Sequence, residues 1–179
     1  MGHAPELAER VLAGCGDRFA HSAAVARRAA ELAVTVPEAD RELLVPAAWL
    51  HDIGYASALA RTGFHPLDGA RHLDLLGWPA RLCALVAHHS GARFVAAQLG
   101  LTAQLNSYPH EHTALSDALT YADQTVDTRG NRVTLRRRLA DMLGRHGPDS
   151  TNARVHHLRE PDIVAIATRV EHRLRGAPV

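Results

Sequence analysis

Residues 47–55 read AAWLHDIGY, and the prediction of the fold starts from this stretch. Apolar residues recur through it at helical spacing, which predicts a helix over 38–53 that ends before Gly54. His51 and Asp52 then stand side by side at the end of that helix, and imidazole and carboxylate groups are both good ligands for a divalent transition metal. An isolated His-Asp pair more often belongs to a solvated helix end, so the interpretation depends on what else the chain carries.

The composition is typical of one globular domain. The chain has 179 residues, of which 46% are hydrophobic and 22% are charged, enough to bury a core. A formal net charge of +1 argues against a nucleic-acid-binding protein, which is usually strongly basic. Cys15 and Cys83 have neither a metal-binding spacing nor a disulfide framework. Because no signal-peptide pattern or membrane-spanning apolar run is found, we expect a cytoplasmic protein without membrane contact.

The periodicity of apolar residues predicts an all-α fold, a bundle of about seven helices. No alternating strand pattern of useful length and no internal repeat is found. Residues 94–112 are expected to form a loop or a lid, and residues 148–159 a connector. The segments with helical character are 4–13, 17–36, 38–53, 66–76, 79–89, 113–127, 133–145 and 161–174.

Several of these segments carry a candidate ligand, which matters because the chain has 13 histidines. His21 lies on the inward stripe of its helix, and His65 precedes a proline at a helix start. Asp123 stands among apolar residues, where a buried carboxylate needs a partner. His88 and His89 end another helix, and periodicity alone does not decide which of them points inward. Each residue alone has an ordinary structural explanation, but facing helices of a bundle are where such side chains build a site.

The order His, His-Asp, His, His, Asp resembles that of the HD-domain metal-dependent phosphohydrolase superfamily. The resemblance covers about residues 17–130. It implies a single HD domain over 1–179, in which helices from 133–175 complete the bundle. It is carried by His21 in RFAHSAAVA, His51-Asp52 in AWLHDIGY, His65 in FHPLDGA, His88 in ALVAHHSGA and Asp123 in LTYADQTVD.

The resemblance also implies a set of metal ligands. The family's minimal set carries over to four residues: His21, His51, Asp52 and Asp123. His65 and His88 look like the additional pair of the dinuclear, HDIG-type subset, whose pattern favours His88 over His89. Within that subset the chain looks most like the symmetrical diadenosine-tetraphosphate hydrolases. It departs from them at His89, where they have a small hydroxyl residue, and in the segment 94–112.

The chemistry implied is hydrolysis of a nucleotide or another small phosphorylated compound. Two divalent ions, or one in a mononuclear version, would bind, with Asp52 as the bridging carboxylate. Mostly histidine ligation favours iron or manganese over magnesium. A metal-activated hydroxide would attack phosphorus. Arg93 and Arg129 are the candidates for holding the phosphate, since guanidinium groups bind it well. The oligomeric state stays open.

Two other functions are compatible with the same residues. Some HD-domain proteins with six such ligands are mixed-valent di-iron oxygenases. Activity on a phosphoester with manganese, against oxygen uptake by the iron form, separates the two. A third possibility is a non-catalytic HD module that binds a nucleotide, for which tight binding without turnover would be diagnostic.

Overall fold

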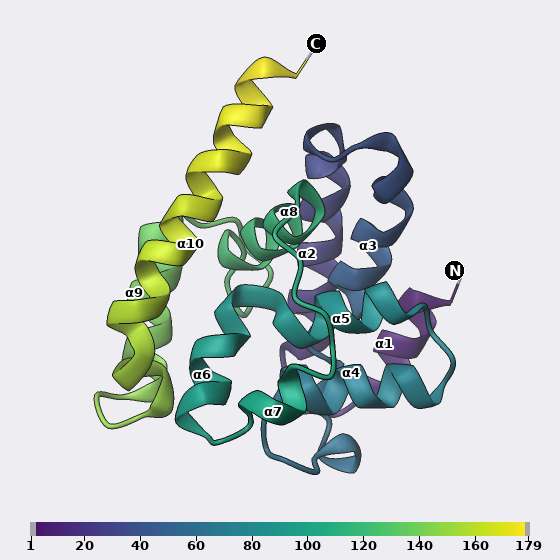
Figure 1. Cartoon of the computed structure of the whole chain (residues 1–179), viewed down its shortest axis with the longest axis vertical. Helices are drawn as coiled ribbons and strands as arrows, with labels where there is room; N and C mark the ends of the chain where they lie inside the picture. The colour runs from purple at the N-terminus through teal and green to yellow at the C-terminus, as the bar shows by residue number, and fades with distance from the viewer. Residues whose placement is uncertain (1–2, 178–179) are drawn as a thin grey trace.

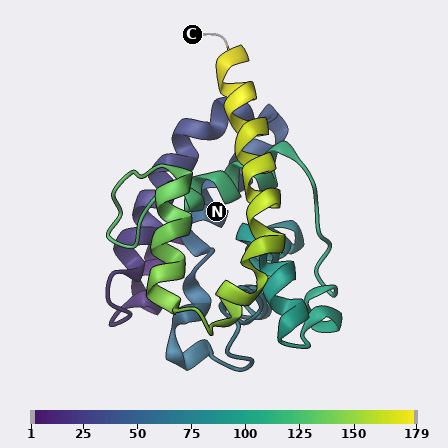
Figure 2. The same ribbon diagram turned by 90° about the vertical axis from the view of Figure 1, so that its left-hand side faces the viewer.

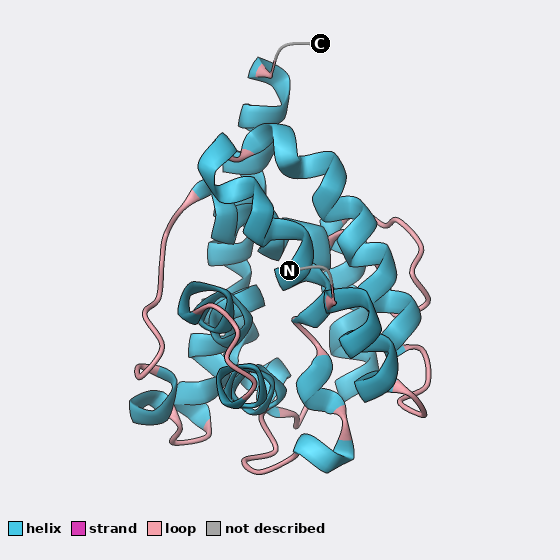
Figure 3. Ribbon diagram, turned by 90° about the vertical axis from the view of Figure 1, so that its right-hand side faces the viewer, coloured by secondary structure: helices cyan, strands magenta, loops and turns pink. Residues whose placement is uncertain are grey.

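The structure, a computed structural model, describes residues 3–177, and within this range every regular element is a helix (Figure 3). An isolated antiparallel bridge links Val126 and Arg132, but the described residues form no strand. The predicted all-α bundle is therefore confirmed. None of the helices in this range is both long enough and apolar enough to cross a membrane.

The first three α-helices pack against one another at one side of the bundle (Figure 1). α1 (Ala4–Leu12) has Pro5 in its first turn, where the missing N–H costs no helical hydrogen bond. α2 (Arg18–Leu32) and α3 (Arg41–Leu50) follow, and α3 contains Pro46. Their inner faces bring fully buried leucines to the core: Leu12, Leu32, Leu44 and Leu50.

α8 (Ala114–Gln124) connects the two halves of the chain, because it packs against α2, α3 and the C-terminal helix. Its start is fixed by a capping box in which the side chain of Thr113 accepts a hydrogen bond from the amide of Ser116, while the Ser116 hydroxyl accepts one from the Thr113 amide. α4 (His65–Leu75) and α5 (Ala80–His88) pack against each other.

Two short helices occupy part of the region predicted as a loop, residues 94–112. α6 spans Ala92–Gln98 and α7 spans Thr102–Leu105. Ala96 and Leu105 are buried in the core and tie these helices down. The prediction was wrong here because helices this short draw their stability from tertiary packing, which leaves little periodic signal in the sequence.

The chain ends in a helical hairpin whose two members lie side by side (Figure 2). α9 spans Leu135–His146, and α10 spans Thr151–Gly176. α10 therefore includes most of residues 148–159, which the sequence predicted to be a connector. Its start is set by the side chain of Ser150, which accepts a hydrogen bond from the Ala153 amide. α10 then continues past the rest of the bundle toward the C-terminus (Figure 1).

Candidate metal centre

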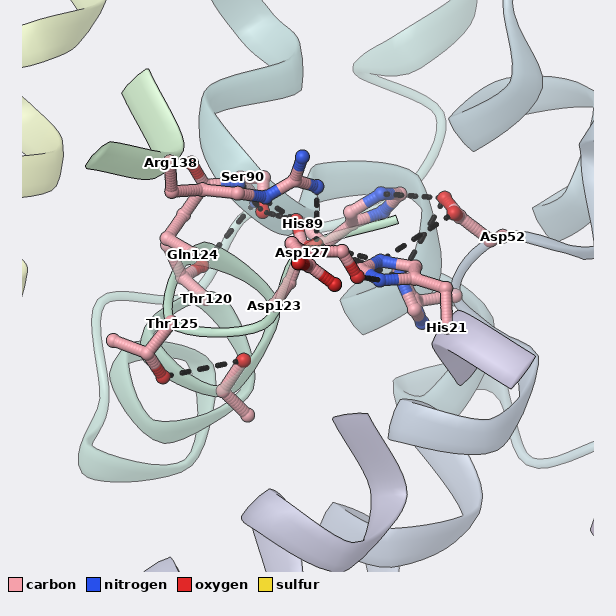
Figure 4. Close-up of polar contacts among 12 residues, drawn as sticks. His21, Asp52, His89, Ser90, Thr120, Asp123, Gln124, Thr125, Asp127 and Arg138 are labelled. Atoms are coloured by element: carbon pink, nitrogen blue, oxygen red, sulfur yellow. Dashed lines mark hydrogen bonds and ion pairs between the residues drawn. The ribbon is translucent and has the colours of Figure 1, made fainter. Parts of the chain in front are cut away.

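Six ionisable side chains from five parts of the chain meet in the centre of the bundle, and Figure 4 shows several of them. Two of them come from the first turn of α2 and the last turn of α8, and the others stand at helix ends or in the turns between helices. All but one of these residues are at most 5% exposed. The six are His21 on α2, His51 and Asp52 after α3, His65 at the start of α4, His89 after α5 and Asp123 on α8.

The carboxylate of Asp52 faces three imidazoles through one of its oxygens. Its Oδ1 lies 3.3 Å from Nε2 of His65 and 3.5 Å from Nε2 of His51. The same oxygen lies 3.8 Å from Nε2 of His89. Donor atoms of His51, Asp52 and His89 all lie within 4.8 Å of one another, a spacing that one metal ion can bridge.

Asp123 makes a second, adjoining group of possible ligands. Its Oδ1 lies 3.0 Å from Nε2 of His21 and 3.8 Å from Nε2 of His51, and these three donor atoms also lie within 4.8 Å of one another. The other oxygen, Oδ2, accepts hydrogen bonds from the Ser90 hydroxyl and, at 2.8 Å, from the Gln124 amide (Figure 4). His51 is shared by the two groups.

Backbone carbonyls orient three of the histidines. Nδ1 of His21 donates to the carbonyl of Asp127 at 2.8 Å. Nδ1 of His51 donates to Ala48 at 2.7 Å. Nδ1 of His89 donates in the same way to the carbonyl of Val86. Because a carbonyl oxygen can only accept, all three Nδ1 atoms must carry a proton. Each Nε2 is then left to face the carboxylates, which is how ligating histidines are held in metal sites.

The lone pairs of the histidine Nε2 atoms and the carboxylate oxygens in this cluster need a cation to bind. Burial lowers the pKa of His51 and His89, and an unprotonated Nε2 there and a carboxylate oxygen of Asp52 are both acceptors, so they repel each other at 3.5 and 3.8 Å. Nε2 of His51 is buried and has no hydrogen-bond partner within residues 3–177, although a buried polar atom without a partner is costly. A metal ion would accept lone pairs from all of these atoms at once. Imidazole and carboxylate ligands together suit a transition metal, so these six residues are chemically able to hold a divalent transition-metal ion.

The model of the HD-domain family matches residues 18–126, well over half of the chain. This chain belongs to the HD-domain family. Most members of that family are metal-dependent hydrolases. No curated protein and no solved structure gives a significant match.

Burial and charge set the protonation of the HD-domain cluster. Burial alone would raise the pKa of Asp52 and Asp123, but neighbouring imidazoles, and for Asp123 also Arg138, outweigh it and hold both pKa values well below the usual range. Burial also opposes protonation of His21, yet its hydrogen bond to Asp123 raises its pKa. Burial lowers the pKa of the remaining histidines of the cluster: His51, His65 and His89.

A close backbone approach at Gly54 and a left-handed turn after α5 accompany the HD-domain histidines. A Cβ on Gly54 would lie 2.0 Å from the carbonyl oxygen of His65, so only glycine lets α4 approach the turn after α3. Beyond α5, Ser90 and Gly91 have positive φ values of 52° and 72°. This left-handed turn follows the end of α5, and His89 and the Ser90 hydroxyl face the cluster there.

The structure places His89, not His88, in the cluster, which corrects the expectation drawn from the resemblance. His88 donates from Nε2 to the carbonyl of Tyr108 at 2.8 Å and stacks on His110 at 4.6 Å between ring centroids. His89 is the C-cap residue of α5 and continues the buried stripe of Leu82, Leu85 and Val86, so it faces inward. Of the six expected ligands, the other five do meet.

The two arginines expected to bind phosphate also lie elsewhere. Arg93 forms an ion pair with Asp162 at 3.0 Å, away from the cluster. Arg129 is exposed in the loop after α8. Both expectations were wrong because nearness in sequence to a ligand does not decide where a long side chain points.

Two other arginines contact the carboxylates of the cluster. Arg18 donates to Oδ2 of Asp52 at 2.9 Å, and Arg138 donates to Oδ1 of Asp123 at 3.3 Å. Arg138 is only 7% exposed, although it stands in a run of three arginines, Arg136 to Arg138. Its spacing of four from Met142, which is also buried, is the signal that would have placed it on the inner face of α9.

A cavity of about 410 Å³ opens beside the cluster, a volume typical of small-molecule sites. One wall carries Asp52, His65, His89 and Asp123. Elsewhere the lining is apolar, with Phe64, Val95, Leu99 and Met142, or basic, with Arg18, Arg138, Arg145 and Arg159. A concave site with both characters can bind an anion that carries an apolar group.

Proposed function

We propose that this chain is a metal-dependent phosphohydrolase that cleaves a phosphoester or phosphoanhydride bond of a small phosphorylated compound, most simply a nucleotide. One observation carries the proposal: buried histidines, among them His51 whose Nε2 has no hydrogen-bond partner among the described residues, face two carboxylates at the wall of a cavity with four arginines. The histidines and carboxylates would bind a transition metal, and the arginines would bind a phosphate.

The ligands divide between two adjoining positions. His21, His51 and Asp123 would hold one ion, and Asp52 with His65 and His89 would hold a second, with His51 within reach of both positions. Asp52 is our candidate for the bridging carboxylate, because its Oδ2 lies 3.8 Å from Nε2 of His21 while its Oδ1 lies 3.3 Å from Nε2 of His65. Four imidazoles favour iron or manganese. From this ligand set we also propose that the chain belongs to the dinuclear, HDIG-type subset of the family.

In the reaction, two bound divalent ions would supply a hydroxide at neutral pH and neutralise charge on the phosphoryl oxygens. The chain's own part is to hold and orient the phosphate. Once Asp52 and Asp123 bind metal, Arg18 and Arg138 can turn from these carboxylates to the phosphate. A guanidinium group binds phosphate well, because it donates two parallel hydrogen bonds to it. Arg18 is held over the ring of Tyr55, 3.6 Å from its centroid, and Tyr55 stacks on His65 at 3.9 Å.

The apolar side of the cavity supports a nucleotide as the substrate. Phe64, Val95 and Leu99 line the same cavity as the charged groups and offer a surface to a base or another flat apolar group. A symmetrical dinucleotide, as cleaved by the hydrolases that the sequence resembles, is the first compound to test.

The test combines metal analysis with phosphate release. We expect the freshly purified full chain to contain iron or manganese and to release phosphate from at least one nucleotide in a panel from nucleoside monophosphates to diadenosine tetraphosphate. His51→Ala should lose both metal and activity, because His51 serves both ligand groups. Oxygen uptake by the iron form without phosphate release would replace the proposal by an oxygenase. Tight nucleotide binding without turnover in every metal would replace it by a binding module.

A further inference from the structure

Part of the cavity wall beside the histidine cluster comes from the α9–α10 hairpin, which lies outside the residues matched by the HD-domain model. This wall carries Arg138 and Arg145 on α9 and Arg159 on α10. Arg138 is paired with Asp123 at the cluster. The other two arginines have no such role, so they need a separate explanation.

Arg159 is a buried cation without an anionic partner. It is 7% exposed, its Nε atom is buried without a hydrogen-bond partner, and no carboxylate of residues 3–177 forms an ion pair with it. Its one side-chain hydrogen bond among the described residues goes from Nη1 to Oδ1 of Asn152 at 3.0 Å. Burial lowers its pKa, which means that the site disfavours the charge as it stands. Such a charge is expensive unless something negative binds it.

The N-terminus of α10 opens onto the same place. Ser150, Thr151 and Asn152 line the cavity, and Asn152 holds the Arg159 guanidinium. The first N–H groups of a helix have no acceptor within the helix, and the helix dipole adds partial positive charge there. Helix starts of this kind bind phosphate and other anions. The start of α10 and the guanidinium of Arg159 therefore lie beside the same part of the cavity.

Arg145 adds a third positive group to this region. It lines the cavity and is exposed enough to reach a ligand. Burial of part of the side chain, together with the like charges of Arg138 and Arg18, lowers its pKa. Four cations crowded into one cavity repel one another, and the two carboxylates nearby are already engaged by histidines, Arg18 and Arg138.

The arginine wall and the histidine cluster are parts of one continuous site. The stem of Arg159 crosses Gly91 so closely that a Cβ there would lie 2.8 Å from its Cγ. The residue before Gly91 is Ser90, whose hydroxyl donates to Asp123. A ligand on the arginine wall is thus a direct neighbour of a group bound at the cluster.

We propose that Arg145, Arg159 and the start of α10 form a second anion subsite, which binds a phosphate of the substrate that is not cleaved. This inference rests on the proposed function, since it assigns the scissile phosphate to the histidine cluster. It narrows the substrate to a compound with at least two phosphates, such as a nucleoside polyphosphate or a bisphosphate. The HD-domain core would supply the chemistry, and the C-terminal hairpin would select the substrate.

The test measures binding of inorganic pyrophosphate to the full chain by calorimetry after metals have been removed with a chelator. Arg145→Gln and Arg159→Gln should each weaken binding by about tenfold, because each removes charge-assisted hydrogen bonds. Arg137→Gln on α9 and Arg154→Gln on α10 are matched controls on exposed faces of the same helices, and they should bind as the native chain does. Arg145 is exposed, so its variant keeps the test usable if Arg159→Gln folds poorly.

A second measurement separates this inference from the proposed function. With metal bound, both subsite variants should lower by about tenfold the preference, in kcat/KM, for a nucleoside triphosphate over the monophosphate, while Arg154→Gln keeps it. Pyrophosphate binding that ignores both arginines overturns the subsite, even in an active hydrolase. Binding that depends on both arginines, in a chain that releases no phosphate with any metal, supports the subsite and overturns the hydrolase.

Discussion

His88 and His89 are consecutive residues, yet their imidazoles face opposite sides of the helix that they end. Nε2 of His89 lies 3.8 Å from Asp52 in the central cluster, whereas Nε2 of His88 donates to the carbonyl of Tyr108 at 2.8 Å. α5 ends at His88, because the backbone of His89 is extended with a ψ of 151°, and the left-handed turn at Ser90 and Gly91 follows. The pair thus offers a natural comparison between a ligand and its neighbour.

The first prediction uses that comparison. His89→Ala should lower the metal content from two ions per chain toward one, because it removes a ligand of the second position, while His88→Ala should leave the content unchanged. His65→Ala should behave as His89→Ala does. Elemental analysis of the purified variants measures this, with circular dichroism as a check of folding. Loss of metal in His88→Ala but not in His89→Ala would contradict the assignment.

The sequence predicted those features that depend on local pattern. Periodic apolar residues located the helices that bury them, and five of the six clustered side chains were recognised by the spacing of His and Asp in the chain. Periodicity alone left the choice between His88 and His89 open, and the resemblance favoured His88, but the buried stripe of α5 continues to its C-cap, His89. The inward position of Arg159 depends on the packing of α10 across Gly91, a contact between distant segments.

The second prediction concerns the close approach at Gly54. Gly54→Ala should destabilise the chain by more than about 3 kcal/mol or prevent folding, because the new Cβ would meet the His65 carbonyl at 2.0 Å and backbone cannot move aside cheaply. Gly69→Ala should cost less, since its Cβ would lie 3.1 Å from the Gly54 nitrogen. Urea unfolding measures both variants.

Gly144→Ala is the matched control for the Gly54 substitution. Gly144 lies within α9, and a Cβ there meets nothing within 4 Å. Alanine should therefore stabilise the helix by about 0.5–1 kcal/mol. A Gly54→Ala variant that unfolds at the same urea concentration as the native chain would show that α4 does not need this approach.

The third prediction concerns the attachment of α10 to α8. The buried carboxylate of Asp117 accepts hydrogen bonds from Nε and Nη2 of Arg169, at 2.9 and 2.6 Å, and from Arg173. Asp117→Asn should cost about 1.5–3 kcal/mol, because it weakens charge-assisted hydrogen bonds that hold the two helices together. Asp141→Asn, on an exposed pair with Arg137, should change the stability by less than about 0.5 kcal/mol. Equal unfolding midpoints for the two variants would argue against this anchoring.

The last prediction concerns the pH dependence of stability in alkaline solution. Burial, and then the charge of Asp74, raises the pKa of the Cys83 thiol to about 11, and the residue is 1% exposed. In the unfolded chain a thiol loses its proton near pH 8.5. Between these values the unfolded state binds fewer protons than the folded state, so the free energy of unfolding falls as the pH rises.

Urea unfolding of the native chain and of Cys83→Ala at pH 8 and pH 10.5 isolates this contribution. Other groups titrate in both proteins, so the difference between the two pH profiles belongs to Cys83. The native chain should lose up to about 2 kcal/mol more than the variant over this interval. In the folded chain at pH 8, a disulfide reagent should label Cys15, which is partly exposed, well before Cys83. Parallel pH profiles for the two proteins, or rapid labelling of Cys83, would mean that the thiol is not held protonated by the core.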